Sequence, residues 1–349
     1  MKQVTSYAVI IAGGAGERLW PLSTPERPKQ FLKIFGGKSL IRQAMERVLP
    51  LVPTENVLVV TARSLERATR EELPELPREN LLLEPCRKNT GPAIAAALGE
   101  IRRRAGDRAV VSVLTADQLM TKPNAFRRML RKAFGIAVKK DVIVTLGVKP
   151  TFPATGYGYI DAARLVFVEK PDAATAKKYV ASGKYVWNAG MFIFRTGALQ
   201  DILTETAPDL ASVSERVCRA KSANAIFPRL YPTLTSISFD YAVMEKTRQI
   251  DVVSGDFGWD DVGSYTSLFQ HLPKDAHGNA VLGPIRQLDW RNCAFVSEGA
   301  RISTFGLDDI VVATLGDEIL VMSAKRAAEL KSLLSVKCAV YGKEKSNGR

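Results

Sequence analysis

Residues 7–21, YAVIIAGGAGERLWP, join an apolar run to a glycine-rich turn. The run 7–12 is hydrophobic at every position, which is typical of a strand buried on both faces. It is too short, and too soon followed by Gly13 and Gly14, to be a membrane helix or a signal peptide. Glycines after a strand let backbone N–H groups approach a phosphate closely. The stretch therefore indicates a buried strand that ends at either a phosphate-binding turn or a plain tight turn.

The glycine-rich turn does not match the dinucleotide-binding fingerprint. Counting from Gly14, the last glycine of GxGxxG would have to stand where the chain has Leu19. Two cations favour the phosphate interpretation: Arg18 lies in the turn, and PKQFL (28–32) returns Lys29 to the same region. Taken alone, Lys29 fits a solvated surface lysine better than a phosphate ligand.

Strands and helices alternate through the first 150 residues. Strands are expected at 56–61, 80–83, 109–114 and 142–147, and helices at 40–49, 65–73, 90–104 and 124–139. Strands that are apolar on both faces and alternate with helices predict a parallel sheet covered on each side. Right-handed crossovers then give a doubly wound, mostly parallel α/β domain, Rossmann-like, which binds ligands beyond the carboxyl ends of its strands.

The regular alternation of predicted strands and helices ends after residue 150. Strands are expected at 157–160, 165–168 and 191–194, and helices at 173–182, 199–206 and 210–220. Beyond Gly278, short β-rich segments at 294–296, 300–304, 310–314 and 319–322 precede a last helix at 327–334. They predict a small β-helix-like domain. We therefore expect two domains, an α/β one over 1–275 and the small one over 276–349.

Composition sets broad limits on function. The chain has 349 residues, 46% of them hydrophobic and 24% charged, as in ordinary globular proteins. Its net charge of +13 would attract phosphates, nucleic acid or anionic lipid. The four cysteines form no CxxC pair and only two histidines accompany them, so a structural zinc site is not expected. Free thiols favour a reducing cytoplasm.

Acidic residues occur where such a sheet would hold a cation. Asp117 comes just after the buried strand predicted at 109–114, and GWDDVG (258–263) supplies Asp260 and Asp261. Each could be a turn or a helix cap. Together they make a credible pair of Mg²⁺ ligands. The chain has no Ser/His/Asp set and no convincing nucleophilic cysteine, so covalent catalysis is not expected.

Three further motifs suit a sugar phosphate. TGYGY (155–159) places Tyr157 and Gly158 together, VEKP (168–171) supplies Glu169 and Lys170, and WNAGM (187–191) supplies Asn188. A carboxylate and an amide offer the acceptors and donors that sugar hydroxyls need, and a lysine suits a phosphate. Each motif alone also fits a turn, a surface ion pair or a polar strand residue.

The ordered set of motifs strongly resembles the mannose-1-phosphate guanylyltransferases, or GDP-mannose pyrophosphorylases, which are sugar nucleotidyltransferases with the nucleotide-diphospho-sugar transferase fold. The matching segments are GGAGERLWPLSTPERPKQFL (13–32), EPCRKNTGPAIAAA (84–97), TADQ (115–118), GVKPTFPATGYGYI (147–160), FVEKPD (167–172), WNAGMFIF (187–194), SISFDYAVMEK (236–246) and GWDDVGSY (258–265). The chain is similar to the short form of the family, without the phosphomannose isomerase domain that many relatives carry.

The resemblance implies a role for each candidate residue. The nucleotide would be bound by Gly13, Gly14, Gly16, Arg18, Asn89 and Asp117, with the loop 84–92 helping to select guanine. Mannose 1-phosphate would be bound by Tyr157, Gly158, Glu169, Lys170 and Asn188. The catalytic set would be Arg18, Lys29, Asp117, Lys170 and Asp261, of which Asp117 and Asp261 would hold Mg²⁺. The implied reaction converts GTP and mannose 1-phosphate into GDP-mannose and pyrophosphate.

The chain departs from the family pattern at several positions. Relatives usually have Pro-Ala-Asp-His where this chain has Thr115-Ala116-Asp117-Gln118, and commonly have alanine at the position of Gly91. Glu17 stands where many relatives have threonine, so we expect its carboxylate to face away from the phosphates. The segment 160–168 is shorter than usual. These differences concern specificity more than the class of reaction.

Three alternatives remain. The chain could act on another nucleotide or sugar phosphate, could be a non-catalytic regulatory homologue that binds GDP-mannose, or could bind nucleic acid through its positive charge. We expect neither nucleic acid nor a membrane as a partner. A homodimer formed through the β domain would cover the edges that short strands leave exposed.

Overall fold

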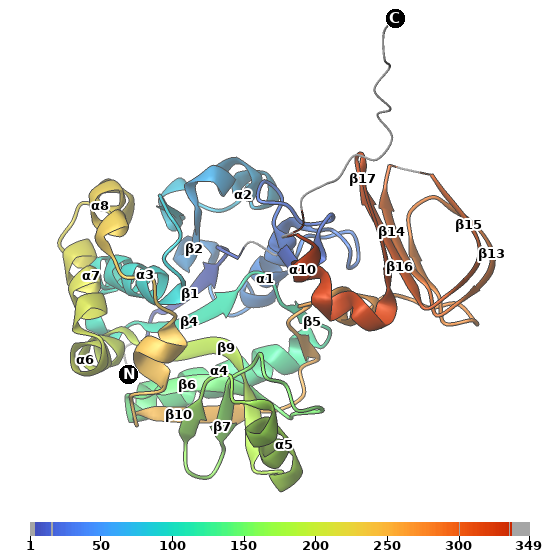
Figure 1. The fold of residues 1–349 in the computed structure, drawn as a ribbon. Coiled ribbons are helices and arrows are strands. Elements are labelled where there is room, and N and C mark those ends of the chain that lie inside the picture. The colour runs from blue at the N-terminus through green and yellow to red at the C-terminus, as the bar shows by residue number, and fades with distance from the viewer. Residues whose placement is uncertain (1–3, 15–16, 300, 335, 337–349) are drawn as a thin grey trace, which may run out of the picture. The chain divides into compact units, whose positions relative to one another are not determined.

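The computed structural model describes residues 4–14, 17–299, 301–334 and 336 (Figure 1). The chain divides into two compact units. The first contains Met1–Gly14 and Gln30–Asp261, and the second contains Ala15–Lys29 and Val262–Arg349.

A mixed sheet forms the centre of the first unit. Its main strands are β1 (Ser6–Ile11), β2 (Val57–Ala62), β3 (Leu81–Glu84), β4 (Val110–Thr115), β6 (Ile143–Val148), β9 (Tyr185–Arg195) and β10 (Ile250–Ser254). They lie in the order β10-β6-β9-β4-β1-β2-β3, and only β9 runs antiparallel to its neighbours in this row. A hairpin of β7 (Tyr159–Asp161) and β8 (Val166–Val168) pairs with β9. The predicted doubly wound, mostly parallel α/β fold is confirmed.

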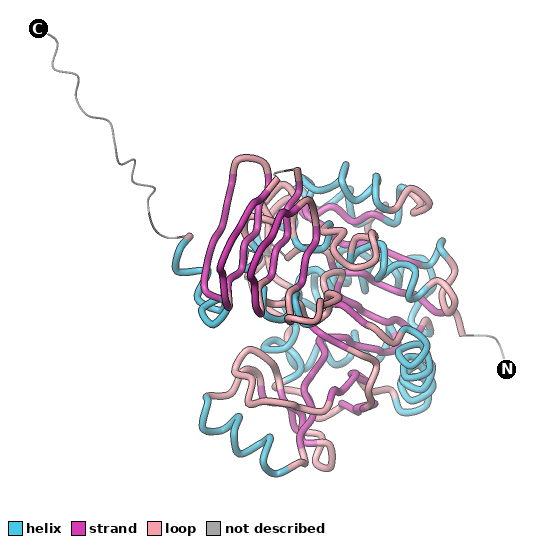
Figure 2. Tube along the Cα trace, turned by 90° about the vertical axis from the view of Figure 1, so that its right-hand side faces the viewer, coloured by secondary structure: helices cyan, strands magenta, loops and turns pink. Residues whose placement is uncertain are grey.

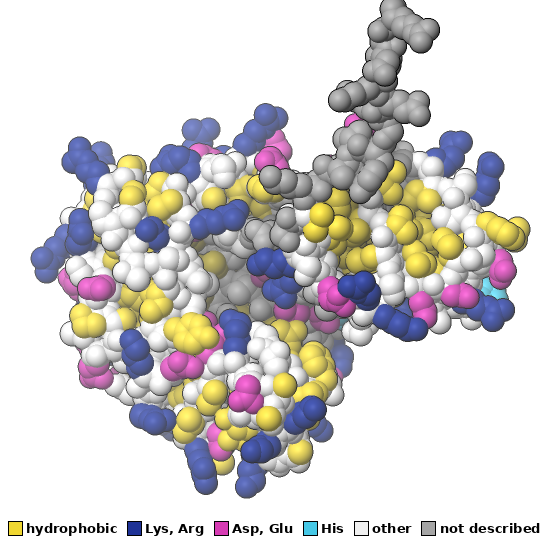
Figure 3. Space-filling view, in the orientation of Figure 1, with side chains coloured by type: hydrophobic (Ala, Val, Ile, Leu, Met, Phe, Trp, Pro, Cys, Tyr) yellow, Lys and Arg dark blue, Asp and Glu magenta, His cyan; other side chains and the backbone are white. Residues whose placement is uncertain are grey.

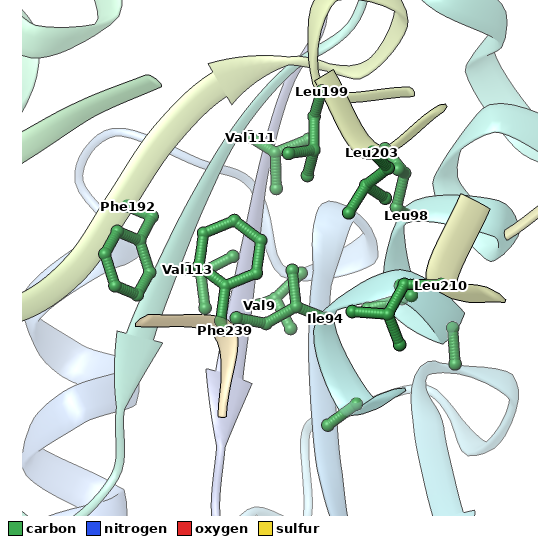
Figure 4. Close-up of a cluster of buried hydrophobic side chains, with 14 of the residues drawn as sticks. Val9, Ile94, Leu98, Val111, Val113, Phe192, Leu199, Leu203, Leu210 and Phe239 are labelled. Carbon is green, nitrogen blue, oxygen red and sulfur yellow. The ribbon is translucent and has the colours of Figure 1, made fainter. Parts of the chain in front are cut away.

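Helices cover the two faces of this sheet. They are α1 (Leu40–Val48), α2 (Glu66–Glu72), α3 (Thr90–Ala105), α4 (Pro123–Lys140), α5 (Ala173–Ser182), α6 (Thr196–Thr206), α7 (Pro208–Cys218) and α8 (Ala223–Leu230). Strand β1 shows why helices must cover both faces of the sheet. Val9 packs with α3 and α6 on one side, while Ala8 and Ile10 pack with α1 and α4 on the other. Figure 4 shows the first of these layers around Val9, Ile94 and Leu199. Each fully buried large apolar side chain contributes about 1.5–3 kcal/mol.

Some elements of the first unit were not expected from the sequence. Strand β10, IDVVS, adds to the edge of the sheet beside β6, although only two of its five residues are buried. Helix α8 and a π-helix at Asp240–Met244 were also missed. Strand β9 is longer than predicted because its first half pairs with β7 as well as β6.

The second unit contains coils of short strands. Its strands are β12 (Ala280–Leu282), β13 (Ile285–Arg291), β14 (Ala294–Glu298), β15 (Ile302–Asp308), β16 (Ile310–Leu315) and β17 (Glu318–Ser323). Up to β16, successive strands alternate between a sheet β12-β14-β16-β17 and a sheet β13-β15 and pair in parallel; β17 then pairs antiparallel with β16. This alternation is the β-helix-like arrangement that the sequence predicted, and Figure 2 shows the strands lying alongside one another.

The core of the β coils is small and aromatic. The rings of Trp290 and Phe295 stack with centroids 3.9 Å apart, beside the buried Cys293 and Val312. The expected strand at 300–304 begins at 302, with residue 300 outside the described part of the chain. The expected last helix is a 3₁₀ segment, Ala324–Glu329, followed by α10 (Leu330–Leu333).

A short helix in the second unit fixes the segment after the glycine-rich turn. In α9 (Tyr265–Gln270), the buried Tyr265 hydroxyl donates to the carbonyl oxygens of Leu19 and Trp20 at 3.1 and 3.0 Å. Among the described residues, no helix is both long and apolar enough to cross a membrane.

Candidate active site

A pocket of about 240 Å³ opens at the carboxyl ends of β1, β3 and β4. Its lining includes four of the predicted nucleotide residues, Gly13, Gly14, Asn89 and Asp117, together with Gln30, Glu84, Arg87, Lys88, Thr90, Ala93 and Thr115. The pocket lies where a sheet of this kind places its ligands. Gly16 lies outside the described residues, so its predicted role stays a prediction.

Glu84 places a carboxylate in this pocket. Its side chain is buried at the end of β3, and the Tyr231 hydroxyl donates to Oε1 at 2.6 Å. Burial raises the pKa of Glu84 above its ordinary value, although the Tyr231 hydrogen bond and the charge of Arg87 oppose the rise. A Cβ atom on Gly13 would stand 3.3 Å from Oε2. A glycine at position 13 therefore leaves this carboxylate accessible from the pocket.

The amino end of α3 forms another wall. Asn89 caps the helix with φ +67°, and its Oδ1 accepts from the Thr90 N–H at 2.8 Å. The helix dipole favours an anion here, although the N–H groups of Thr90 and Gly91 are already paired and Pro92 has none. The segment around Ile237 braces this end, because Gly91 N donates to Ile237 O and Ile237 N donates to Lys88 O. A Cβ on Gly91 would stand 2.7 Å from Ile237 O, so the alanine common in relatives would require the segment around Ile237 to lie slightly farther from the helix start.

Asp117 and Asp261 lie on neighbouring segments. Asp117 follows β4 and is close to Gly14, whose Cβ would stand 3.9 Å from Oδ2. The short strands β5 (Leu119–Met120) and β11 (Trp259–Asp260) pair antiparallel, with Asp260 opposite Leu119. Asp261 is the next residue along, and Tyr157 donates its hydroxyl hydrogen to Asp261 Oδ1 at 2.8 Å.

These two carboxylates are hard oxygen donors, which suits Mg²⁺. The described residues contain no group of three or more His, Cys, Asp and Glu that could hold a metal ion. A pair of carboxylates still fits this ion, because Mg²⁺ usually keeps waters and takes phosphate oxygens as further ligands. The donor set therefore agrees with the Mg²⁺ site that the sequence predicted, without testing it.

Gln118 joins the side of the site where a metal is predicted to the side where the sugar is predicted. Its Nε2 donates to Ala189 O at 3.0 Å, and its Oε1 accepts from Trp259 Nε1 at 2.9 Å. Both polar ends of the amide are therefore used. One neighbour, Ala189, follows Asn188, and the other, Trp259, lies two residues before Asp261.

The predicted sugar residues lie together around the β7–β8 hairpin and β9. Lys170 forms an ion pair with Glu169 at 2.6 Å, and Lys170 adopts a left-handed backbone with φ +45°. A Cβ on Gly158 would stand 2.6 Å from Glu169 Oε2 and 2.7 Å from the Phe167 ring. Gly158 is therefore needed for the Glu169 carboxylate to occupy its place.

Asn188 is held by hydrogen bonds on both sides of its amide. Oδ1 accepts from Thr145 Oγ1 at 2.7 Å and from Gly190 N at 3.1 Å, and Nδ2 donates to Asp240 Oδ1 at 2.9 Å. Asp240 was not among the predicted site residues. Glu84 was predicted only as part of the loop 84–92 that would help to select guanine, and Gln118 only as a departure from the family.

Aromatic rings surround the hydroxyl group that reaches Asp261. Tyr157 contacts Trp187, Trp259 and Phe152 with ring centroids 5.1, 5.3 and 6.3 Å apart. Edge-to-face packing of this kind restricts ring motion. Tyr157 is therefore well placed to fix the carboxylate of Asp261.

Arg18 and Lys29 belong to the second unit. Arg18 is exposed in a 3₁₀ turn at Glu17–Leu19, whereas Lys29 is buried and its Nζ donates to Val262 O at 3.5 Å. Their predicted contacts with the nucleotide phosphates stay predictions, as does the outward orientation of Glu17.

Comparison with known proteins gives consistent results. Residues 7–278 match the model of the nucleotidyl transferase family. The chain is 39% identical to the xanthan biosynthesis protein XanB of Xanthomonas campestris pv. campestris over 341 residues, which cover 94% of this chain and 72% of that protein. It is 35% identical to a mannose-1-phosphate guanylyltransferase of Escherichia coli K12, over 96% of this chain and 74% of that protein.

A solved structure is similar over nearly the whole chain. It is that of a Thermus thermophilus protein named mannose-1-phosphate geranyltransferase, with a TM-score of 0.86 and 35% sequence identity. The similarity covers 95% of this chain and 98% of that one. The fold and the family predicted from the motifs are both supported by this match.

Proposed function

The chain belongs to the nucleotidyl transferase family, and we propose that it transfers GMP from GTP to mannose 1-phosphate, giving GDP-mannose and pyrophosphate. The observation that carries this proposal is the Gln118 bridge. Asp117 lines the nucleotide pocket, and the next residue is hydrogen-bonded to the segment that bears Asn188. A nucleotide and a sugar phosphate bound at these two places would meet beside Asp117.

Glu84 supports guanine as the base. Guanine presents two adjacent donors, N1–H and the N2 amino group, and a carboxylate can accept from both. Adenine presents an acceptor at N1, which would face the Glu84 oxygens unfavourably. Because the carboxylate is buried, a base without matching donors would leave it without hydrogen bonds from the ligand. The free energy lost in this way discriminates strongly between substrates.

The proposed chemistry needs no protein nucleophile. A phosphate oxygen of mannose 1-phosphate forms a bond to the α-phosphorus of GTP, and the bond from that phosphorus to the oxygen bridging to the β-phosphate breaks. That oxygen leaves as part of pyrophosphate, so atoms and charges balance. The catalytic contribution of the protein is to hold two anions in line and to stabilise the charge that spreads during transfer.

Each group of residues would do part of this work. Gly13, Gly14 and the start of α3 would hold the nucleotide, and Arg18 and Lys29 would neutralise the triphosphate and the departing pyrophosphate. Glu169, Asn188 and Lys170 would bind the sugar and its phosphate. Asp117 and Asp261 would hold Mg²⁺, which when bound neutralises phosphate charge and favours transfer. The Tyr157 hydrogen bond would orient Asp261 for that purpose.

We also propose a homodimer formed through the second unit. Hydrophobic side chains gather on its surface in Figure 3, and Leu288, Phe305, Ile319 and Val321 are each more than 60% exposed. Leu288 and Phe305 lie directly opposite each other in the β13–β15 pair. Light scattering on the purified chain at micromolar concentration should give twice the monomer mass, and a monomer would contradict this proposal.

The remaining expectations concern the surroundings of the protein. The three described cysteines, Cys86, Cys218 and Cys293, are free thiols, which fits a reducing cytoplasm. We propose the substrates, GDP-mannose and pyrophosphate as the small-molecule partners, with no nucleic acid and no membrane.

Initial rates of pyrophosphate release in the presence of Mg²⁺ test the proposed activity. Mannose 1-phosphate and glucose 1-phosphate are each combined with GTP, ATP, UTP, CTP and dTTP. The proposal predicts the highest kcat/KM for mannose 1-phosphate with GTP. Turnover with another pair would keep the reaction class and change the specificity. Folded protein that binds GDP-mannose without any turnover would favour the regulatory homologue.

A further inference from the structure

Asp240 lies at the start of the π-helix Asp240–Met244, on a segment far from the sugar-binding motifs in sequence. The three residues that follow Tyr241 in this π-helix, Ala242, Val243 and Met244, are buried, as is the preceding Phe239. The backbone is also tied down, because Phe239 N donates to Thr90 Oγ1 at 2.9 Å. This anchoring fixes where the Asp240 carboxyl group lies.

Hydrogen bonds direct that carboxyl group toward the predicted sugar pocket. Thr145 and Gly190 occupy Asn188 Oδ1, so the amide must turn its NH₂ group toward Asp240. Asn188 Nδ2 then donates to Asp240 Oδ1 at 2.9 Å. No other side chain among the described residues donates a hydrogen bond to the Asp240 carboxyl group. Asn188 thus holds one carboxyl oxygen, and in the described part of the chain the only other hydrogen bond to this group comes from the backbone of Asp240 itself.

The charges around Asp240 are unfavourable without a ligand. Burial, and then the nearby Glu169 carboxylate, raise the pKa of Asp240 to about 7, although Lys170 and the Asn188 hydrogen bond act in the opposite direction. Lys170 is itself paired with Glu169. Two carboxyl groups therefore share one lysine, which leaves an excess of acceptors. Sugar hydroxyls are donors that could use them.

We infer that Asp240 is a further sugar-binding residue, whose carboxyl group receives a hydroxyl of the sugar phosphate while holding the amide of Asn188 in place. This inference rests on the proposed function, because it assigns a residue to the same sugar pocket. It predicts that removing the Asp240 carboxylate selectively weakens binding of the sugar phosphate. Nucleotide binding should change little, because Asp240 is absent from the lining of the nucleotide pocket.

The alternative is that Asp240 only supports Asn188. Deoxy analogues separate these two roles, since a residue that binds one hydroxyl loses its effect when that hydroxyl is missing. A residue that only supports the pocket lowers the activity toward all analogues by the same factor. A site built to bind a hydroxyl group also discriminates strongly against the analogue that lacks it.

The test compares wild-type protein with Asp240→Asn and Asp240→Ala, using GTP and the mannose 1-phosphates that lack the 2-, 3-, 4- or 6-hydroxyl. Asp201→Asn, an exposed acid on α6, is the matched control. We expect KM for mannose 1-phosphate to rise at least tenfold in both Asp240 variants, with KM for GTP within twofold of wild type. For one deoxy analogue, the wild-type penalty of tenfold or more should nearly disappear in Asp240→Ala.

Two results would overturn the inference. One is an unchanged KM for the sugar phosphate in both variants, and the other is an equal loss for every deoxy analogue. The isosteric Asp240→Asn keeps the test available if the alanine variant does not fold. Wild-type turnover in the substrate panel tests the proposed function separately. If another sugar phosphate is preferred there, the same variants are measured with that sugar and its deoxy analogues.

Discussion

Gln118 accepts a hydrogen bond from Trp259 Nε1 at 2.9 Å, and so joins the residue after Asp117 to the segment that carries Asp261. The same amide donates to Ala189 O. An amide has a donor end and an acceptor end, and here each end meets a group of the opposite kind. Another side chain at position 118 would have to form both hydrogen bonds to hold the segments of Asp117, Asn188 and Asp261 in the same relative positions.

Replacing Gln118 should therefore weaken the site as a whole. Gln118→Ala removes both hydrogen bonds and leaves the buried Ala189 carbonyl and the partly buried Trp259 indole N–H without their partner, which should cost about 1–3 kcal/mol of unfolding free energy for the first and less for the second. We expect a lower melting temperature, a kcat/KM reduced at least tenfold, and a shift in tryptophan fluorescence as Trp259 loses its partner. Gln287→Ala, at an exposed position of β13, is the control. Unchanged fluorescence and activity would contradict the bridging role.

The metal assignment predicts large losses of rate without unfolding. Asp117→Ala and Asp261→Ala should each reduce kcat by about 100- to 1,000-fold or more, as does the removal of other electrostatic groups at reaction centres. Circular dichroism and melting temperature should stay near wild type. The exposed Asp317→Ala provides a matched control. Chelation of divalent ions should abolish wild-type turnover, and a folded Asp117→Ala protein with a near wild-type rate would refute the assignment.

Glu84 should control the choice of base. In Glu84→Gln, one acceptor becomes a donor that faces a guanine donor, so kcat/KM for GTP should fall by roughly 10- to 100-fold, and discrimination against ATP should shrink. Stability should not suffer in proportion. The folded state raises the pKa of Glu84, so its ionisation disfavours folding as the pH rises above the unfolded value. Rates with GTP and ATP, together with urea unfolding, check both parts. A variant with unaltered base preference would exclude Glu84 from recognition.

Asp240 should make stability depend on pH. Its folded pKa of about 7 exceeds the value of about 4 for an unfolded aspartate, so the folded state holds the proton more tightly. That contribution is present below pH 4 and is lost as the pH rises through 7. Between pH 5 and 8, wild type should lose on the order of 2–3 kcal/mol of unfolding free energy relative to Asp240→Asn.

The charged side chains that act on Asp240 in that experiment are Glu169 and Lys170. Both are present in wild type and in the variant, so the difference between the two proteins isolates Asp240. Urea unfolding at several pH values provides the measurement. A difference that stays constant from pH 5 to pH 8 would mean that Asp240 does not titrate in this range.

The sequence predicts the α/β core well because its strands are apolar on both faces. Strands such as β1 and β4 can be recognised from their own residues, because they are almost entirely apolar. Val110 to Leu114 are all buried in the structure. Strands β10 and β13 were missed because they carry polar and exposed residues and are stabilised by pairing with a neighbour. The π-helix at Asp240–Met244 is too short to show a periodic pattern of apolar residues in the sequence.

The placement of candidate residues was predictable where motifs follow strands, as with Asp117 and the glycine-rich turn. Residues that act through tertiary contacts were not. Glu84 ends the run LLLE, and its hydrogen-bond partner Tyr231 lies 147 residues further along the chain. Asp240 meets Asn188 across 52 residues. Neither pairing leaves a local signal in the sequence, because each depends on how α8 and the following segment pack.

A competition experiment tests the central claim most directly. GTP, ATP, UTP, CTP and dTTP are mixed at equal concentrations with Mg²⁺, glucose 1-phosphate and uniformly ¹³C-labelled mannose 1-phosphate, and the nucleotide sugars formed are identified by mass spectrometry. The label separates mannose from glucose in products that otherwise have the same mass. We predict labelled GDP-mannose as the dominant product. A dominant product with another base or with unlabelled sugar would contradict the proposed function.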